Sequence, residues 1–308
     1  MSRPKDPTIW RDVHGIVLVD KPRGLSSNQA LQKVRRLFRA AKGGHTGSLD
    51  PLATGLLPVC LGEATKIAGH LLGASKAYVA DVRLGVTTAT ADAEGEILET
   101  RPVPPLDAAS IERALAPLRG RIRQVPPIYS ALKQDGVPLY RLAREGVPVQ
   151  VEAREVEVFR LDLVHHDGAD LRLAVECGSG TYVRSLARDL GEALGCGAHL
   201  TALRRTWVEP FRTPAMRTLA EFEAIRAAHG EAGLDALVLS TDAGLAALPL
   251  VALDAAQASK LRQGQPVPLG ASATALCRVH DAGGVLAALG EIDANGVLRV
   301  VRGLNLPG

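Results

Sequence analysis

One histidine and one aspartate stand together among small residues near the start of the chain. Residues 43–55 read Gly-Gly-His-Thr-Gly-Ser-Leu-Asp-Pro-Leu-Ala-Thr-Gly, a segment that holds His45 and Asp50. Glycine lets the backbone take dihedral angles closed to other residues and lets a ligand approach closely. Pro51 biases Asp50 towards an extended conformation, which restricts the direction of its carboxylate. A restricted carboxylate beside a histidine on a loop is a candidate for acid–base or nucleophilic chemistry.

The same residues admit a purely structural interpretation. Asp-Pro is also a common helix start, with Asp50 as the N-cap and Pro51 at the first helical position. Spacing alone leaves both interpretations open.

The segments before this loop must hold it in place. Residues 16–19 are predicted to form a short buried strand, which ends in a turn at residues 21–24. A helix capped by Ser26 or Ser27 is predicted next, because the apolar residues that follow have helical spacing. Its opposite face carries the basic residues Lys33, Arg35, Arg36, Arg39 and Lys42. We therefore expect a basic, amphipathic helix to lead directly into the Gly-His loop.

The rest of the chain mixes strands and helices without a regular strand–helix–strand order. Strands are predicted at residues 78–84, 156–164 and 171–177, and helices at residues 107–118, 181–194 and 218–228. This order predicts the α+β class, with a mixed sheet.

Two regions differ from this pattern. Residues 126–153 are rich in proline and glycine, contain a short helical segment at 139–145, and are predicted to form a protruding insertion with a basic edge. From about residue 249 to 308, short apolar runs are separated by Gly, Pro and Asp, with a hairpin turn at Asn295-Gly296. We therefore expect a main domain over residues 1–248 and a small, mostly-β domain over residues 249–308.

Composition places the chain among ordinary globular proteins. Its 308 residues suffice for two domains, and 46% hydrophobic with 22% charged residues excludes a disordered chain. The four cysteines are widely scattered, which favours buried thiols in a reducing compartment over a zinc or redox site. The first residues have no apolar core, and the longest apolar run, residues 243–253, is too short to span a membrane. We expect a cytoplasmic protein.

The net charge of +3 is too small to indicate a nucleic-acid partner by itself. The distribution of charge along the chain is more informative. Residues 1–50 carry a net charge of +6 and residues 117–154 carry +4, on a chain that is otherwise acidic. Two basic regions of this kind are typical of a polyanion-binding surface. Two solvated helical faces would give the same counts, so charge alone leaves the partner open.

The loop resembles the catalytic loop of the TruB family of bacterial tRNA pseudouridine(55) synthases, whose pattern is Gly-His-Thr-Gly-x-Leu-Asp-Pro-Leu-Ala-Thr-Gly. Every fixed position matches, with Ser48 at the variable one. Further blocks of the family match in order at residues 15–27, 76–78, 126–133, 180–184 and 197–205. The resemblance weakens beyond Val208, where residues 249–308 are similar in size and position to the PUA-like RNA-binding domain that ends many members.

The resemblance implies an isomerisation in which uracil is detached from its ribose and rejoined through carbon 5, so that no redox cofactor or energy source is needed. Asp50 is the implied nucleophile, with attack on the ring or on the ribose left open. Arg184 would hold that carboxylate ionised and oriented. Tyr78 and Tyr182 would pack against the base, and Leu203 would contact it. Without the family, Arg184 is one more basic residue in a helix, and the other three are ordinary core residues.

The resemblance also implies how the RNA is bound. The histidine matching His45 enters the space vacated by the flipped-out nucleotide, because a uracil inside a folded T-loop cannot otherwise be reached. Lys21 and Lys66 stand in matching blocks and would line the pocket. We expect the T-arm of tRNA as the partner, held by phosphate contacts from the basic helix and the insertion. No metal, cofactor, membrane or obligatory protein partner is expected.

Two alternatives remain. One is a guide-dependent synthase of the dyskerin type, which shares the aspartate loop but works inside a ribonucleoprotein. The lack of basic tails and the presence of the insertion argue against it. The other is an RNA-binding folding chaperone in which catalysis is secondary or absent. Intact Asp50, Tyr78 and Arg184 argue against a loss of activity but leave a chaperone role open.

Overall fold

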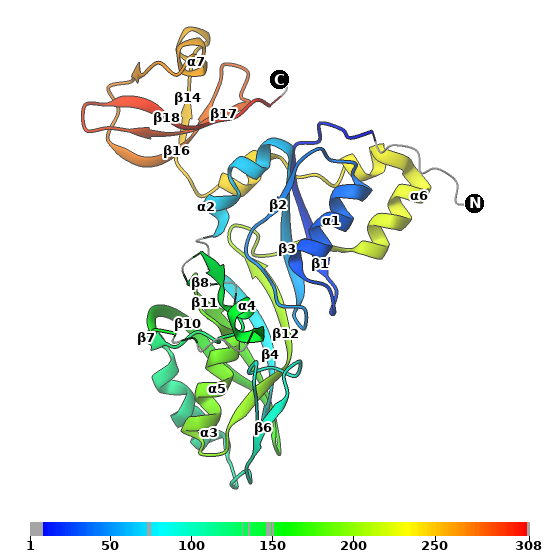
Figure 1. Ribbon diagram of the computed structural model, residues 1–308. Helices are drawn as coiled ribbons and strands as arrows, with labels where there is room; N and C mark the ends of the chain where they lie inside the picture. The colour runs from blue at the N-terminus through cyan, green and yellow to red at the C-terminus, as the bar shows by residue number, and fades with distance from the viewer. Residues whose placement is uncertain are drawn as a thin grey trace.

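The structure is a computed structural model that describes residues 9–72, 75–130, 132–134, 136–145, 149 and 151–306. Its centre is a nine-stranded mixed sheet in the order β13-β1-β3-β12-β4-β11-β10-β7, with β2 paired to β3 (Figure 1). The strands are β1 (Gly15–Lys21), β2 (Gly43–His45), β3 (Thr54–Leu61), β4 (Lys76–Leu84), β7 (Gly120–Gln124), β10 (Arg154–Asp167), β11 (Asp170–Cys177), β12 (Ala198–Val208) and β13 (Arg217–Thr218).

Parallel and antiparallel pairs alternate irregularly across this sheet. β1 runs antiparallel to β3, β3 parallel to β12, and β12 antiparallel to β4. A chain without regular strand–helix–strand order gives such a sheet, so the α+β prediction is confirmed. The strands predicted at residues 16–19, 78–84, 156–164 and 171–177 are β1, β4, β10 and β11.

Helices pack against the sheet or lie in the segments that connect its strands. They are α1 (Ser27–Leu37), α2 (Ala68–Leu72), α3 (Ala108–Leu115), α4 (Leu139–Arg144), α5 (Val183–Ala193), α6 (Leu219–Asp235) and α7 (Ala255–Arg262), with short 3₁₀ turns at Gly62–Lys66, Ala116–Leu118 and Thr241–Leu245. Ser26 caps α1 in a capping box with Gln29, which fixes where the helix begins. The helix predicted at 218–228 continues to Asp235 across a break at Gly230.

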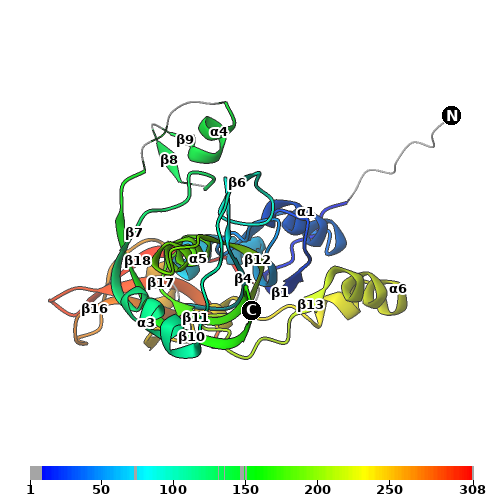
Figure 2. The ribbon, with the colours of Figure 1, turned by 90° about the horizontal axis from the view of Figure 1, so that it is seen from below.

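Two small hairpins extend from the main sheet. β5 (Val86–Thr88) pairs with β6 (Ile97–Thr100), and β8 (Lys133–Gln134) pairs with β9 (Val137–Pro138). The second hairpin and α4 stand away from the main sheet in Figure 2, as expected for a protruding insertion. Parts of the predicted insertion, namely residues 131, 135, 146–148 and 150, lie outside the described residues.

A separate five-stranded sheet forms the C-terminal part of the chain. Its order is β14 (Leu250–Ala252), β16 (Thr274–His280), β17 (Leu286–Ile292), β18 (Val297–Gly303) and β15 (Val267–Pro268). β17 and β18 form the predicted hairpin, and Gly296 in its turn has φ 73°, a value that glycine tolerates. Leu286, Leu289 and Leu304 pack in one apolar cluster with Ile16, Leu56 and other residues of the main sheet. Within the described residues, no helix is long and apolar enough to cross a membrane.

Candidate active site

The Asp50 loop joins β2 to β3 without a helix. Residues 51–53 form a turn in which the Ala53 amide donates to the Asp50 carbonyl at 3.0 Å, and β3 begins at Thr54. The helix-cap interpretation of Asp50 is therefore wrong. The Ser27 hydroxyl, at the start of α1, accepts from the Leu49 amide at 2.7 Å and donates to the Leu49 carbonyl at 3.0 Å. The preceding helix thus fixes the residue next to Asp50.

Arg184 lies directly against Asp50. The Arg184 Nε atom is 3.0 Å from Asp50 Oδ2, and the side chain of Arg184 is only 5% exposed, against 42% for that of Asp50. The two Nη atoms donate to the Thr90 carbonyl at 3.0 Å and to the Tyr129 carbonyl at 2.9 Å. These contacts fix the position of the Arg184 guanidinium. It therefore presents a fixed cation to the Asp50 carboxylate, which is partly exposed.

A second carboxylate lies on the far side of Arg184. Asp92 is 2% exposed, and its Oδ2 atom is 3.5 Å from Arg184 Nη1. Its other oxygen accepts from the Thr90 hydroxyl at 2.5 Å and from the Glu94 amide at 3.0 Å. The three charged groups therefore form a row in which Arg184 lies between Asp50 and Asp92. The segment between β5 and β6, which carries Asp92, holds this row in place.

The charge state of Asp50 depends on opposing effects. Enclosure by protein raises the pKa of the Asp50 carboxyl above its ordinary value, Arg184 opposes this shift, and the negative charge of Asp92 adds to it. The carboxylate is thus a stronger base than a free aspartate and still has a cation beside it.

Asp50 borders two adjoining cavities. The smaller, of about 330 Å³, is lined by Asp50, Tyr78, Tyr182, Arg184 and Leu203, the residues that the resemblance brings together. The larger, of about 800 Å³, also contains Asp50 and Arg184 and is lined on its far side by Thr90, Asp92, Glu94 and His45. A cavity bordered by two tyrosines and a leucine, next to a larger cavity that shares Asp50 and Arg184, suits a base that enters from a larger molecule.

Backbone contacts fix Tyr182 at the start of α5. The Tyr182 amide donates to the Gln124 side chain at 2.8 Å, and the Gln124 amide group donates back to the Tyr182 carbonyl at 3.1 Å. The Arg154 guanidinium lies 5.5 Å from the centre of the Tyr182 ring. The ring therefore lines the smaller cavity from a rigid position.

His45 lies in β2 at the edge of the larger cavity. Its Nδ1 atom is buried and has no hydrogen-bond partner among the described residues. Burial, with the nearby charge of Arg205, lowers the pKa of the ring, which favours the neutral imidazole. A neutral ring with an unsatisfied nitrogen is suited to an incoming polar partner.

Neither predicted lysine lines these cavities. Lys21 is fully buried behind the loop, where its ammonium donates to the Pro22 and Leu25 carbonyls, and burial lowers its pKa to about 8. Lys66 donates to Glu63 at 2.6 Å and to the Gly303 carbonyl of the C-terminal sheet at 3.2 Å. Neither side chain is among the residues that line the two cavities, although the charge of Lys21 lowers the pKa of the Asp50 carboxyl, so a role for Lys21 and Lys66 at the pocket stays a prediction.

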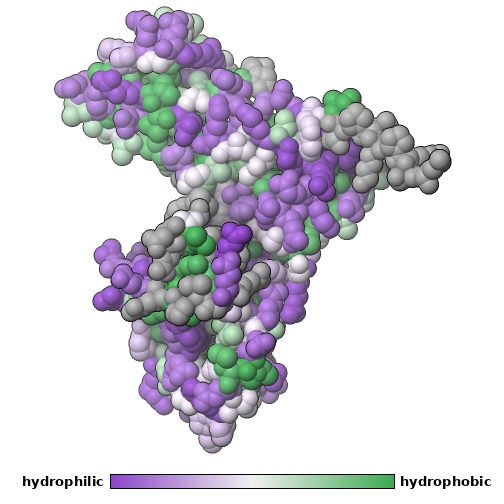
Figure 3. All heavy atoms as spheres, viewed as in Figure 1, coloured by the Kyte–Doolittle hydropathy of each residue, from purple (hydrophilic) through white to green (hydrophobic). Residues whose placement is uncertain are grey.

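The basic residues of α1 and of the segment after it, up to Lys42, are only partly available to a ligand. Arg35 donates to the Ala40 and Ala41 carbonyls and lies 4.3 Å from the centre of the Trp10 ring. Arg39 pairs with Glu231 at 2.8 Å. Lys33, Arg36 and Lys42 are exposed, and hydrophilic residues gather over this part of the molecule in Figure 3. Arg35 and Arg39 therefore bind other parts of the chain, and Lys33, Arg36 and Lys42 stay available for the phosphate contacts expected of the basic helix.

Two buried charged residues of the site were not predicted. Asp92 stands among small residues, as Asp50 does, and that likeness could have identified it. Arg205 ends the matched block 197–205, is 1% exposed and lines the smaller cavity. Its strand position opposite Tyr78 appears only in the sheet register.

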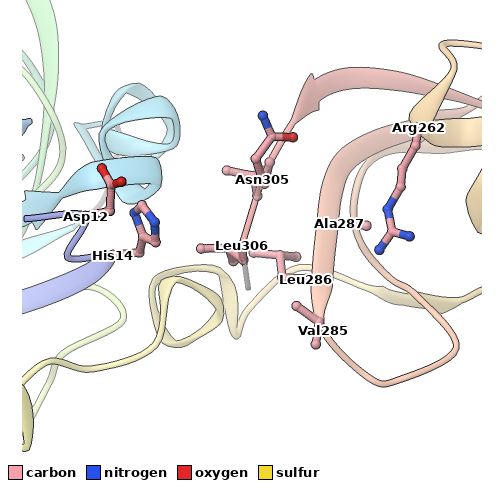
Figure 4. Close-up of a pocket in the computed structure, with 9 residues that line it drawn as sticks. Asp12, His14, Arg262, Val285, Leu286, Ala287, Asn305 and Leu306 are labelled. Carbon is pink, nitrogen blue, oxygen red and sulfur yellow. The ribbon is translucent and has the colours of Figure 1, made fainter. Parts of the chain in front are cut away.

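A third cavity, of about 560 Å³, lies between the N-terminal segment and the C-terminal sheet. Figure 4 shows Asp12 and His14 on one side of it and Arg262 and Ala287 on the other. None of the predicted site residues lines it.

Three family models match consecutive segments of the chain between residues 35 and 304. They are the TruB family pseudouridylate synthase N-terminal domain at residues 35–183, the tRNA pseudouridylate synthase B C-terminal domain at residues 184–246, and the pseudouridine synthase II TruB C-terminal model at residues 249–304. The chain is 57% identical over 301 residues to the tRNA pseudouridine synthase B of Xanthomonas campestris pv. campestris, with 96% of each chain covered. The chain belongs to the TruB family.

Other relatives agree with this assignment. The tRNA pseudouridine synthase B of Ectopseudomonas mendocina is 51% identical, with 94% of each chain covered. A chain in the crystal structure of the archaeal box H/ACA sRNP Nop10-Cbf5 complex superposes with a TM-score of 0.72 at 24% identity, covering 96% of this chain and 87% of that one. That likeness concerns the fold alone. Pseudouridine synthases are isomerases, so this TruB family member is an isomerase.

Proposed function

We propose that this enzyme isomerises the uridine at position 55, in the T-loop of tRNA, to pseudouridine, with Asp50 as the nucleophile. The observation that carries the proposal is the Asp50 carboxylate, 3.0 Å from the buried Arg184, which lines both the smaller and the larger cavity. Relatives that share more than half of its residues are named tRNA pseudouridine synthase B, which supports tRNA as the substrate.

The residues around Asp50 fit this reaction in distinct ways. Tyr78, Tyr182 and Leu203 would enclose the flipped uracil, because they line the smaller cavity. Arg184 would orient Asp50 and keep it ionised. His45, with its unsatisfied nitrogen, would contact the RNA where the base has left the stack. Whether Asp50 attacks the ring or the ribose stays open.

The two outer regions would supply affinity. The exposed cations of α1 and the insertion at residues 126–153 are suited to phosphate contacts. We further propose residues 249–308 as a PUA-like RNA-binding domain, supported by its separate sheet and by the family model at residues 249–304.

Replacing Asp50 by asparagine tests the chemistry. Asp50→Asn keeps the size of the side chain but removes the anionic nucleophile, so turnover should fall by orders of magnitude, with RNA binding and the melting temperature nearly unchanged. Tritium release from carbon 5 of labelled uridine in T-arm RNA measures turnover, and filter retention measures binding. Asp81→Asn is the matched control, because Asp81 pairs with Arg172 on the surface. Near-normal release from folded Asp50→Asn would refute the proposal.

A further inference from the structure

Arg205 and Tyr78 stand opposite each other inside the sheet. They are register partners on the antiparallel strands β12 and β4, and both line the smaller cavity. Residues directly opposite on antiparallel strands have Cβ atoms about 5 Å apart, which brings their side chains into contact. Arg205 is 1% exposed and Tyr78 is 9% exposed. A fixed cation and a phenol thus share the wall of the cavity assigned to the base.

The Arg205 guanidinium is held by the backbone on both sides of the catalytic loop. Nε donates to the Leu56 carbonyl at 2.7 Å, and Nη2 donates to the Gly47 carbonyl at 3.0 Å. A Cβ atom at Gly55 would lie 2.2 Å from the Arg205 carbonyl, so only glycine permits this approach of β3 to β12. The position of the guanidinium is therefore fixed, and its direction is set by the loop that carries Asp50.

The charge of the Arg205 guanidinium acts on the Tyr78 hydroxyl and lowers its pKa. A phenol beside a cation turns its electron-rich oxygen towards the cation and its single proton away from it. The proton is therefore directed at another acceptor. Burial raises the pKa of Tyr78 more than Arg205 lowers it, so the hydroxyl keeps its proton at neutral pH. Tyr78 is therefore a hydrogen-bond donor to the cavity.

We infer that Arg205 is a positioning residue that directs the Tyr78 O–H at a carbonyl oxygen of the target uracil, where this bond stabilises negative charge during isomerisation. The inference rests on the proposed function. When the bond between C1′ of the ribose and N1 of the base breaks, its electron pair stays on the uracil and spreads to the carbonyl oxygens. Addition of Asp50 to the ring would place charge on the same oxygens. Arg205 polarises the phenol, and Tyr78 transfers no proton.

A change of the substrate base tests this role. Single-turnover consumption of the target nucleoside is measured on T-arm RNA that carries uridine or 5-fluorouridine at the target position. Fluorine withdraws electrons from the ring and stabilises the same negative charge without help from the protein. Tyr78→Phe should slow uridine RNA by ~10²–10³-fold, the usual cost of removing one donor to a developing oxyanion, and slow 5-fluorouridine RNA clearly less. Arg205→Gln should show the same preference.

The double variant and a neighbour complete the test. Without the phenol hydroxyl Arg205 has nothing to direct, so Tyr78→Phe/Arg205→Gln should be little slower than Tyr78→Phe alone. Arg204→Gln is the matched control, because Arg204 pairs with Asp20 outside the cavity, and it should react as the wild type does with both bases. Thermal melts establish that each variant is folded.

The outcomes separate this inference from the proposed function. Equal slowing of both bases by Tyr78→Phe, or multiplied effects in the double variant, would mean that the two residues only support the structure and would overturn the inference. If Arg205→Gln does not fold, Tyr78→Phe with the two bases decides alone. A wild type that forms no pseudouridine on uridine RNA would overturn the proposed function and the inference together.

Discussion

The Arg184 guanidinium lies between two carboxylates, and Arg184 and Asp92 shift the pKa of Asp50 in opposite directions. Arg184 touches the Asp50 carboxylate at 3.0 Å, and Asp92 lies behind Arg184 at 3.5 Å. Because Asp92 shares the guanidinium, it fixes the orientation of Arg184 and also weakens the pull that Arg184 exerts on Asp50. One buried carboxylate thus contributes both to the position of Arg184 and to the basicity of the proposed nucleophile, which burial raises most.

Removing that second charge should change the pH profile in a defined direction. Enclosure and Asp92 both raise the pKa of Asp50, and activity needs its ionised form, so the rate should fall as pH falls through this raised pKa. In Asp92→Asn the pKa of Asp50 should drop, and the acid limb of kcat/KM should move to lower pH. The plateau should also fall, by roughly 10–100-fold, because Arg184 is less well oriented.

The profile of kcat/KM against pH checks this prediction. Asp81→Asn, which removes a surface carboxylate, should leave the acid limb in place. An acid limb that stays in place or moves to higher pH in Asp92→Asn would mean that Asp92 does not act on the charge of Asp50.

At the scale of elements, α1 and the segment after it, up to Lys42, carry two kinds of basic residue. Arg35 and Arg39 bind the chain itself, through the Ala40 and Ala41 carbonyls and through Glu231. The exposed residues Lys33, Arg36 and Lys42 are the ones that can reach phosphates. Replacing these three by glutamine should lower the slope of log affinity against log salt by roughly 0.7–0.9 for each phosphate that the helix no longer neutralises.

Filter retention over a range of salt concentrations measures that slope. The control is Arg35→Gln/Arg39→Gln, which should lower the melting temperature and leave the slope near the wild-type value. An unchanged slope after replacement of Lys33, Arg36 and Lys42 would exclude α1 as part of the RNA-binding surface.

Features of the fold and of the site that depend on neighbouring residues could be predicted from the sequence. The strands around Ile16 and Tyr78 and the start of α1 at Ser26 depend on burial and capping within a few residues, and all were predictable. The Asp50 turn was ambiguous, because Asp-Pro suits both a helix start and a loop. The contacts of Lys66 with Gly303 and of Arg184 with Asp92 join distant segments, and no local spacing encodes them.

At the scale of the whole molecule, the C-terminal sheet is packed firmly against the catalytic part. Leu286, Leu289 and Leu304 share an apolar cluster with Ile16 and Leu56 of the main sheet. A truncation before Leu250 would expose that face to water, so its effect on activity would combine weaker RNA binding with lower stability. A single polar substitution where the two sheets meet is a cleaner probe.

Glu63 is that position. Its Oε2 atom accepts from Lys66 at 2.6 Å and from the Asn305 amide at 2.7 Å, and Lys66 reaches the Gly303 carbonyl, so the carboxylate joins the two sheets. Burial alone would raise the pKa of Glu63, but the bonds from Lys66 and Asn305 lower it overall. The stabilisation is thus fully present above the ordinary pKa of glutamate and is lost as pH falls through the lowered value.

Glu63→Gln should reduce the free energy of unfolding by roughly 1–3 kcal/mol at neutral pH, because a charge-assisted pair becomes a neutral one. The difference from the wild type should shrink in acid, where the wild-type carboxylate is protonated as well. Urea unfolding at neutral and acid pH measures both effects. Glu99→Gln, at an exposed pair with Arg101, should change the stability much less than Glu63→Gln does. If Glu63→Gln is as mild as Glu99→Gln, the apolar cluster alone holds the two sheets together.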